Sequence, residues 1–164
     1  MAEGVRMIYV IEGPDGTGKS TLAAAIAKKV NGQVLHLTYK QTKSSERYHI
    51  IFMQAAQDLD DIGIPVILDR WVPSERVYGN VFRKGERFNT DKVIKAYGNG
   101  VVWIYCRNDN AVENHLRNKS LRSEMFDSMG KIAPAFDEYI ARSPLNWLVY
   151  DYTKISKEEF AENL

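Results

Sequence analysis

The chain has 164 residues, of which 45% are hydrophobic, and this content is sufficient for one domain with a buried core over residues 1–164. Its 22 Lys and Arg residues nearly balance its 21 Asp and Glu residues, and the net charge of +1 argues against a broad nucleic-acid-binding or membrane-binding surface. The single cysteine, Cys106, excludes an intramolecular disulfide framework. No export signal or long apolar span is recognisable, so we expect a soluble cytoplasmic protein.

Five short apolar runs recur along the chain and are predicted to be strands. They cover residues 7–11, 34–37, 64–68, 101–105 and 146–150. Each is rich in β-branched and aromatic residues and only about four to eight residues long, which is typical of buried strands. Helical segments between them favour parallel βαβ units. We therefore expect an α/β three-layer sandwich, with helices on both faces of a five-stranded parallel sheet and ligands at the carboxyl ends of the strands.

Three helices are predicted between these strands. The first covers residues 20–30 and ends before Asn31-Gly32, and the second covers residues 45–62 and ends at Gly63. The third run, residues 123–141, contains Gly130 and Pro134, so we expect it to be kinked or broken there.

The turn after the first strand has the spacing Gly13-x-x-x-x-Gly18-Lys19-Ser20, which is a complete P-loop between a predicted strand and a predicted helix. Glycines allow backbone N–H groups to surround phosphates, and the helix N-terminus favours the same anion. Lys19 is predicted to reach the β- and γ-phosphates of ATP, and Ser20 to ligate Mg²⁺. The alternative is a glycine-rich turn that only joins strand and helix. The predicted ATP-binding residues are Gly13, Asp15, Gly16, Thr17, Gly18, Lys19, Ser20 and Thr21.

An acid and a base follow the third strand directly. Asp69 and Arg70 should lie at the carboxyl edge of the sheet, where a ligand crevice is expected. Asp69 is predicted to hold the metal through water or to steer an acceptor hydroxyl, and Arg70 to bind an acceptor phosphate bidentately. The alternative is that Asp69 caps the next helix and Arg70 is an ordinary surface residue.

Together, IEGPDGTGKST (residues 11–21) and DRWVPSERVY (residues 69–78) resemble the two signatures of the thymidylate kinase family of nucleoside monophosphate kinases. Residues 111–128 are similar, more weakly, to the family's basic lid. The resemblance implies Mg²⁺-dependent phosphoryl transfer from ATP to a (deoxy)nucleoside 5′-monophosphate, with dTMP as the expected acceptor and a diphosphate as the product. It also implies a small lid at about residues 117–124 and a homodimer. The near-neutral composition predicts no nucleic-acid partner.

The resemblance also assigns residues to the acceptor. Asp15 would approach the acceptor's sugar hydroxyl, Arg70 would hold its 5′-phosphate, Phe52 would stack on its base and Tyr78 would wall the same pocket. Trp71 and Ser74 belong to the same acceptor-binding motif.

The resemblance places the catalytic charge on the lid. Position 16 is glycine, and family members without an arginine in the P-loop supply the transition-state charge from the lid, which here means Arg117 and Arg122. The catalytic set implied is therefore Lys19, Asp69, Arg70, Arg117 and Arg122, with Ser20 and Asp69 on the metal.

The chain departs from the family pattern at one base-reading position. Ala56 stands where the family commonly has an arginine, so Gln54 or Gln57 would have to read the base edge. Three alternative functions remain open: a deoxynucleoside kinase, for which Glu12 is the available acid, a kinase of modified bases in DNA, and a nucleotide-binding regulatory ATPase. The histidines, His36 among them, have no metal-ligand spacing and are expected to be ordinary residues.

Overall fold

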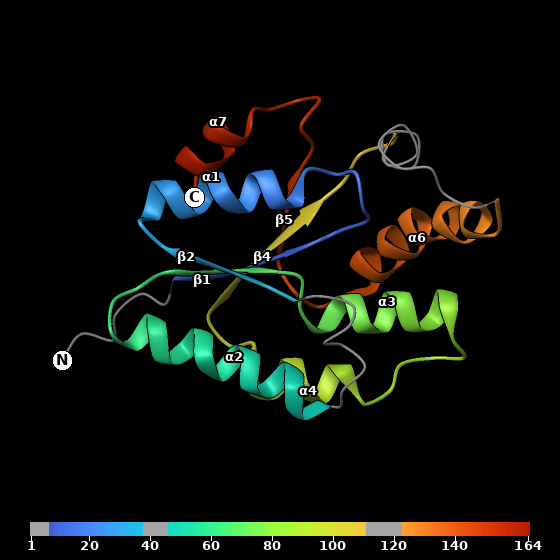
Figure 1. The fold of residues 1–164 in the computed structure, drawn as a ribbon, viewed down its shortest axis with the longest axis horizontal. Helices are drawn as coiled ribbons and strands as arrows, with labels where there is room; N and C mark the ends of the chain where they lie inside the picture. Colours follow the sequence, from blue (N-terminus) through green and yellow to red (C-terminus); the bar gives the residue numbers. More distant parts are fainter. Residues whose placement is uncertain (1–6, 38–45, 111–122) are drawn as a thin grey trace.

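The computed structural model describes residues 7–37, 46–110 and 123–164 (Figure 1). The elements are β1 (Ile8–Glu12), α1 (Lys19–Val30), β2 (Gln33–His36), α2 (Glu46–Asp61), β3 (Val66–Asp69), α3 (Val72–Phe82), α4 (Thr90–Tyr97), β4 (Val101–Cys106), α6 (Ser123–Arg142), β5 (Trp147–Tyr150) and α7 (Lys157–Glu162). The five strands form one parallel sheet in the order β2-β3-β1-β4-β5. This confirms the expected fold class, and each predicted strand is found within two residues of its expected bounds.

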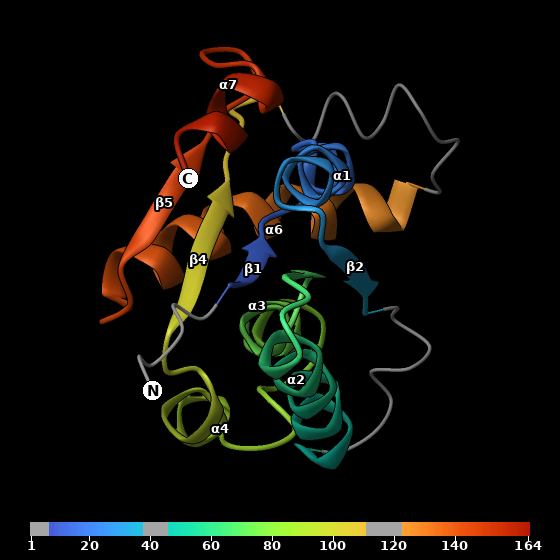
Figure 2. The same ribbon diagram turned by 90° about the vertical axis from the view of Figure 1, so that its left-hand side faces the viewer.

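Helices cover both faces of the sheet. Alternate residues of each strand point to opposite sides, so apolar side chains on both sides are buried under helices. On one face, Tyr9 and Ile11 of β1 pack against Leu22 and Ile26 of α1, with α7 beside α1 (Figure 2). On the other face lie α2, α3, α4 and α6 (Figures 1 and 2). The central strand β1 is buried over its whole length, as expected for a parallel sheet enclosed by helices.

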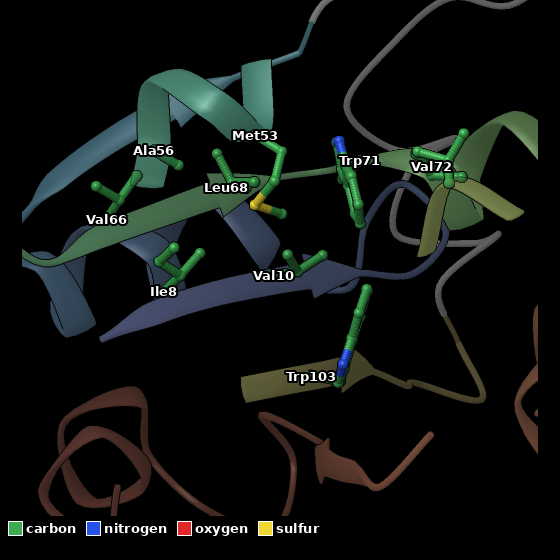
Figure 3. Packing of buried hydrophobic residues seen from close by; sticks show 10 residues of the cluster. Ile8, Val10, Met53, Ala56, Val66, Leu68, Trp71, Val72 and Trp103 are labelled. Carbon is green, nitrogen blue, oxygen red and sulfur yellow. The ribbon is translucent and has the colours of Figure 1, made fainter. Parts of the chain in front are cut away.

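The core on the second face contains large side chains from α2, β3, α3 and β4. Met53 of α2 packs over Val10 and Leu68, and the indole of Trp71 lies near that of Trp103 with ring centroids 6.0 Å apart (Figure 3). The ring centroid of Trp103 in turn lies 5.4 Å from that of Trp147 of β5. This packing fixes the start of α3 against the sheet, next to the carboxyl ends of β1 and β3.

The predicted helices in residues 20–30 and 45–62 are found as α1 and α2. The third predicted run is one continuous helix, α6, with Pro134 inside it, so the expected break is not found. Ile132 and Phe136, on either side of the proline, are both fully buried in one cluster with Tyr105. Helices α3, α4 and α7 were not predicted as elements.

Among the helices of the described residues, none is long and apolar enough to cross a membrane.

Candidate nucleotide-binding site

The P-loop lies at the carboxyl edge of the sheet, between β1 and α1, and its glycines adopt left-handed backbone angles. The φ angle is 142° at Gly13, 80° at Gly16 and 78° at Gly18. At Gly13 space is also limiting, because a Cβ atom there would lie 2.3 Å from the carbonyl oxygen of Cys106 at the end of β4. Only glycine allows the loop to pass β4 at this distance.

Lys19 is buried against the inside of its own loop. Its Nζ donates to the Pro14 carbonyl at 2.6 Å, and Thr17 Oγ1 donates to the same oxygen at 2.7 Å. Burial lowers the pKa of Lys19 to about 8, and the positive charge of Arg70 acts in the same direction. The carboxylate of Asp15, 3.8 Å from Nζ, opposes this shift. The charge of the lysine is therefore only partly compensated by the groups around it.

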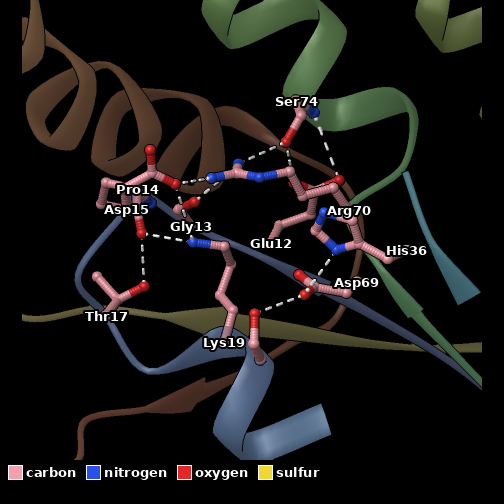
Figure 4. A network of polar contacts seen from close by, with 11 residues as sticks. Glu12, Gly13, Pro14, Asp15, Thr17, Lys19, His36, Asp69, Arg70 and Ser74 are labelled. Atoms are coloured by element: carbon pink, nitrogen blue, oxygen red, sulfur yellow. Dashed lines mark hydrogen bonds and ion pairs between the residues drawn. The ribbon is translucent and has the colours of Figure 1, made fainter. Parts of the chain in front are cut away.

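Arg70 reaches across from the end of β3 to the P-loop (Figure 4). Its guanidinium donates to Asp15 Oδ1 at 2.6 Å, and to the Gly13 carbonyl and Ser74 Oγ at 3.0 Å each. The same group lies 5.1 Å from the centre of the Tyr78 ring. Arg70 has φ 74°, a left-handed conformation that is unfavourable for a residue with a Cβ atom. Strain of this kind at a site residue is typical of functional positions.

Glu12 lies beneath this arginine and is fully buried. Its carboxylate accepts hydrogen bonds from the backbone N–H of Trp71 at 2.7 Å and from the Ser74 hydroxyl. Burial raises the pKa of Glu12 to about 7, although Arg70 and the hydrogen bonds favour the ionised form. Glu12 thus connects the base of the P-loop to the start of α3.

Asp69 receives two donors on one oxygen. Ser20 Oγ donates to Asp69 Oδ2 at 2.8 Å, and His36 Nδ1 lies 3.0 Å from the same atom (Figure 4). The other oxygen, Oδ1, is buried and has no hydrogen-bond partner among the described residues. His36 is the site residue that the sequence did not indicate. It ends β2 opposite Asp69 in the strand register, a relation that only the strand order reveals.

The oxygen atoms of Ser20 and Asp69 fit a Mg²⁺ ion that is bound mainly by nucleotide phosphates. Ser20 and Asp69 offer a hydroxyl and a carboxylate with an unpartnered oxygen, and Mg²⁺ in nucleotide sites commonly keeps several waters and takes few protein ligands. Within the described part of the chain no group of three or more His, Cys, Asp or Glu side chains is arranged to hold a metal alone.

Two adjoining pockets surround the P-loop. The first, of about 280 Å³, is lined by Lys19, His36, Asp69 and Arg70 among others. The second, of about 610 Å³, shares Gly16, Gly18 and Thr21 with the first and continues past the end of β5, at Tyr150, to the start of α7. The smaller pocket has the charged lining that a phosphate chain needs, and the larger one lies next to it. All eight residues predicted for ATP lie in or beside the P-loop, between β1 and the first turn of α1.

The structure brings most of the predicted acceptor residues together. Asp15, Arg70, Ser74 and Tyr78 form one connected group. Phe52 lies on α2, partly buried against the core of the second face, and its ring centroid is 5.9 Å from that of Tyr48.

Trp71 differs from its expected role as an acceptor contact. Its side chain is fully buried in the core, and its Nε1 donates to the His49 carbonyl at 2.9 Å. The tight turn at Arg70 directs the indole inward while it directs the guanidinium to the P-loop.

Two further sequence-based expectations concern the base-reading residues and the lid. The amide of Gln57 donates to the Tyr97 carbonyl at 3.3 Å and so joins α2 to α4. Ala56 is fully buried, because this side of α2 faces the sheet. Arg117 and Arg122 lie outside the described residues, as does most of the predicted lid at 117–124.

The sequence has limited similarity to known families. The model of the ATPase family associated with various cellular activities (AAA) matches residues 9–69, which contain the P-loop and Asp69. A protein of Acidianus bottle-shaped virus (isolate Italy/Pozzuoli) named "Putative thymidylate kinase" is 26% identical over 83 residues. These are 50% of this chain and 53% of the viral protein, so the chain spans about half the length of this relative.

Similarity to solved structures extends over nearly the whole chain. The YorR protein of Bacillus subtilis, solved in complex with phosphorylated GDP, has a TM-score of 0.72 at 22% identity, with 95% of this chain and 92% of that chain covered. Deoxyadenosine kinase of M. mycoides with bound dATP has a TM-score of 0.60 at 19% identity, with 96% and 98% covered. At these identities the similarity establishes the fold and not the substrate. The chain therefore carries a P-loop and shares the α/β fold of these two solved structures.

Proposed function

We propose that this protein transfers the γ-phosphoryl group of ATP to a (deoxy)nucleoside 5′-monophosphate and releases a nucleoside diphosphate. The observation that carries the proposal is the position of Arg70. Its guanidinium reaches the P-loop at Asp15 and Gly13 and is held at 3.0 Å from Ser74, so an anion-binding cation from β3 lies directly beside the phosphate-binding loop. This position suits a cation that would hold the phosphate of an acceptor next to the donor phosphates.

On the donor side, the positive end of α1 and the backbone N–H groups of the P-loop would bind the β- and γ-phosphates. Lys19 would exchange its contact with the Pro14 carbonyl for phosphate oxygens. Mg²⁺, held by Ser20 and through water by Asp69, would neutralise charge on the transferred group. These groups position the donor and stabilise charge, which is most of what phosphoryl transfer requires.

On the acceptor side, Arg70 has a geometry suited to a phosphate. Its planar guanidinium favours bidentate contact with phosphate oxygens, and Ser74 and Tyr78 fix its orientation. Asp15, which now accepts from Arg70, is the nearest acid for a sugar hydroxyl. Accordingly, we expect the acceptor to carry its phosphate on Arg70 and its sugar beside Asp15.

The names and bound molecules of the similar proteins are consistent with nucleotide ligands at this site. The viral relative is named for thymidylate and YorR was solved with phosphorylated GDP. The M. mycoides deoxyadenosine kinase was solved with dATP and, in another structure, with dCMP as a product, so its acceptor is a nucleoside. We propose dTMP as the first acceptor to test, in keeping with the two signature motifs.

The second candidate function is a deoxynucleoside kinase, because the M. mycoides neighbours are deoxyadenosine kinases. Such an enzyme needs a base for the 5′-hydroxyl, and Glu12 is the acid that this alternative assigns to the role. Its side chain is fully buried and accepts hydrogen bonds from the first turn of α3, so it is poorly placed to reach a substrate. This geometry argues against Glu12 as that base and leaves the more exposed Asp15 as the acid that a nucleoside acceptor would need.

The test is a substrate panel with ATP and Mg²⁺. The acceptors are the common ribo- and deoxynucleoside monophosphates, the matching nucleosides and a single-stranded oligonucleotide, and the products are identified by mass spectrometry. We expect a nucleoside diphosphate from at least one monophosphate, and Arg70→Ala should raise the acceptor KM more strongly than the ATP KM. Phosphorylation of nucleosides or DNA alone, or ATP hydrolysis that no acceptor accelerates, would contradict the proposal.

A further inference from the structure

His36 contacts the same carboxylate oxygen as the P-loop serine. Its Nδ1 lies 3.0 Å from Asp69 Oδ2 (Figure 4). Ser20 Oγ lies 2.8 Å from the same oxygen. An ionised carboxylate is only an acceptor, so Nδ1 carries the hydrogen in this contact. Two donors, one from α1 and one from β2, therefore fix the same oxygen.

The donor from β2 is rigidly placed. His36 pairs with Asp69 in the β2–β3 register, and the next residue, Leu37, donates its backbone N–H to the Asp69 carbonyl at 3.2 Å. The carboxylate itself is almost fully enclosed, with 3% of its side chain exposed, whereas 53% of the His36 side chain is exposed on the wall of the phosphate pocket. The contact thus joins an edge strand to the metal-side acid.

Two donors on Oδ2 restrict rotation of the carboxylate and leave Oδ1 without a hydrogen-bond partner among the described residues. Groups that hydrogen-bond a ligating or water-bridged carboxylate set its orientation, and their loss typically weakens metal binding by roughly 10- to 100-fold. We propose that His36 is a positioning residue for the metal side of the site, and that its Nδ1–H holds Asp69 in the orientation needed by Mg²⁺ and its waters. This inference rests on the proposed function, whose donor is Mg²⁺-bound.

Two amide substitutions at His36 distinguish the role of Nδ1 from that of Nε2. The amide nitrogen of asparagine takes the approximate place of Nδ1, and that of glutamine takes the place of Nε2. His36→Asn should therefore keep the contact with Asp69, whereas His36→Gln and His36→Ala should lose it. Gln33→Ala, at the other end of β2 and exposed, is the matched control.

The first measurement needs no turnover. The thermal shift produced by ADP is followed as Mg²⁺ is titrated, which gives the Mg²⁺ concentration for half of the metal-dependent shift. We expect His36→Ala and His36→Gln to need roughly tenfold more Mg²⁺ than the unmodified protein, and His36→Asn and Gln33→Ala to remain within about threefold of it. The assignment would be overturned if His36→Ala needed no more Mg²⁺ than the unmodified protein, or if Mg²⁺ had no effect on the unmodified protein. It would also be overturned if His36→Gln and not His36→Asn kept the original Mg²⁺ requirement, or if neither variant kept it.

The second measurement uses the acceptor found in the substrate panel. The His36→Ala rate should recover at high Mg²⁺ with the acceptor KM unchanged, and a raised acceptor KM would contradict a positioning role on the metal side. If no acceptor is phosphorylated and the ADP titration behaves as expected, the proposed kinase activity fails while the role of His36 is supported.

Discussion

The carboxylate of Glu12 caps a helix whose N-cap residue, Trp71, lies 59 residues further along the chain. Its Oε1 accepts from the backbone N–H of Trp71 at 2.7 Å, and α3 has no side-chain cap of its own. The first N–H groups of a helix need acceptors, and a carboxylate is also favoured there by the helix dipole. One buried residue therefore connects the end of β1, just before the P-loop, to the helix that carries Ser74 and Tyr78.

The raised pKa of Glu12 predicts a specific pH dependence of stability. The folded value is about 7 and the unfolded value is 4.5, so between these values the folded state binds the extra proton. The stabilisation is complete below the unfolded pKa and is lost as the pH rises through the folded pKa. The isosteric Glu12→Gln cannot titrate. We expect the free energy of unfolding of the unmodified protein, relative to Glu12→Gln, to fall by about 2 kcal/mol between about pH 5 and pH 7.

Urea unfolding of both proteins across this pH range measures the difference in their free energies of unfolding. Contributions from groups that titrate equally in both proteins cancel in this difference. A constant difference would show that Glu12 has an ordinary pKa in the folded state.

The approach of the P-loop to β4 predicts an unusually large cost for Gly13→Ala. Gly13 and Gly85 both have positive φ angles, 142° and 133°. A Cβ at Gly13 would lie 2.3 Å from a backbone oxygen of β4, whereas at Gly85 it would meet nothing within 4 Å. Gly85→Ala therefore reports the backbone strain alone. We expect Gly13→Ala to lower the free energy of unfolding by about 2 kcal/mol more than Gly85→Ala. Equal costs in chemical denaturation would mean that the loop moves away from β4 freely.

The left-handed conformation of Arg70 predicts a reversal of the usual order of alanine and glycine. At φ 74° a Cβ atom costs roughly 1–2 kcal/mol, so Arg70→Gly should be about 1 kcal/mol more stable than Arg70→Ala. At Lys28, an exposed position inside α1, alanine should be more stable than glycine by about the same amount. Both Arg70 variants should raise the acceptor KM to a similar extent, because both lack the guanidinium. If alanine is the more stable residue at both positions, the strain at Arg70 is absent.

The sequence predicts the sheet well because buried parallel strands are continuous apolar runs, and it predicts the P-loop because its chemistry is local in the chain. Helix α3 is harder for the opposite reason. Pro73 and Gly79 resemble breaks, and the group that caps the helix, Glu12, belongs to another strand. By contrast, α4 and α7 have local signals in the capping side chains of Asn89 and Ser156, so these two helices were within reach of sequence reasoning.

The same distinction explains the site. The side chain of Arg70 lies at the carboxyl edge of the sheet, as expected for a residue that follows a strand. The side chain of its neighbour Trp71 lies in the core, because the turn at Arg70 directs adjacent side chains to opposite sides. His36 has no partner near it in the sequence and contacts Asp69 only because β2 and β3 are neighbours in the sheet. Contacts between strands depend on strand order, which no local pattern contains.

The lowered pKa of Lys19 predicts that nucleotide affinity falls in mildly alkaline solution. In the free protein the lysine loses its proton near pH 8, and phosphates bind the charged form. Above that pH, ADP binding must take up a proton, so the affinity should fall by up to about tenfold per pH unit. Lys19→Met has no such proton. The ADP affinity of Lys19→Met should be lower and independent of pH, and the affinities of the two proteins should become similar as the pH rises. Calorimetry in buffers of different ionisation enthalpy measures both the affinity and the proton uptake. A constant gap up to about pH 9.5 would show that Lys19 keeps the ordinary pKa of a lysine and that burial does not weaken its charge.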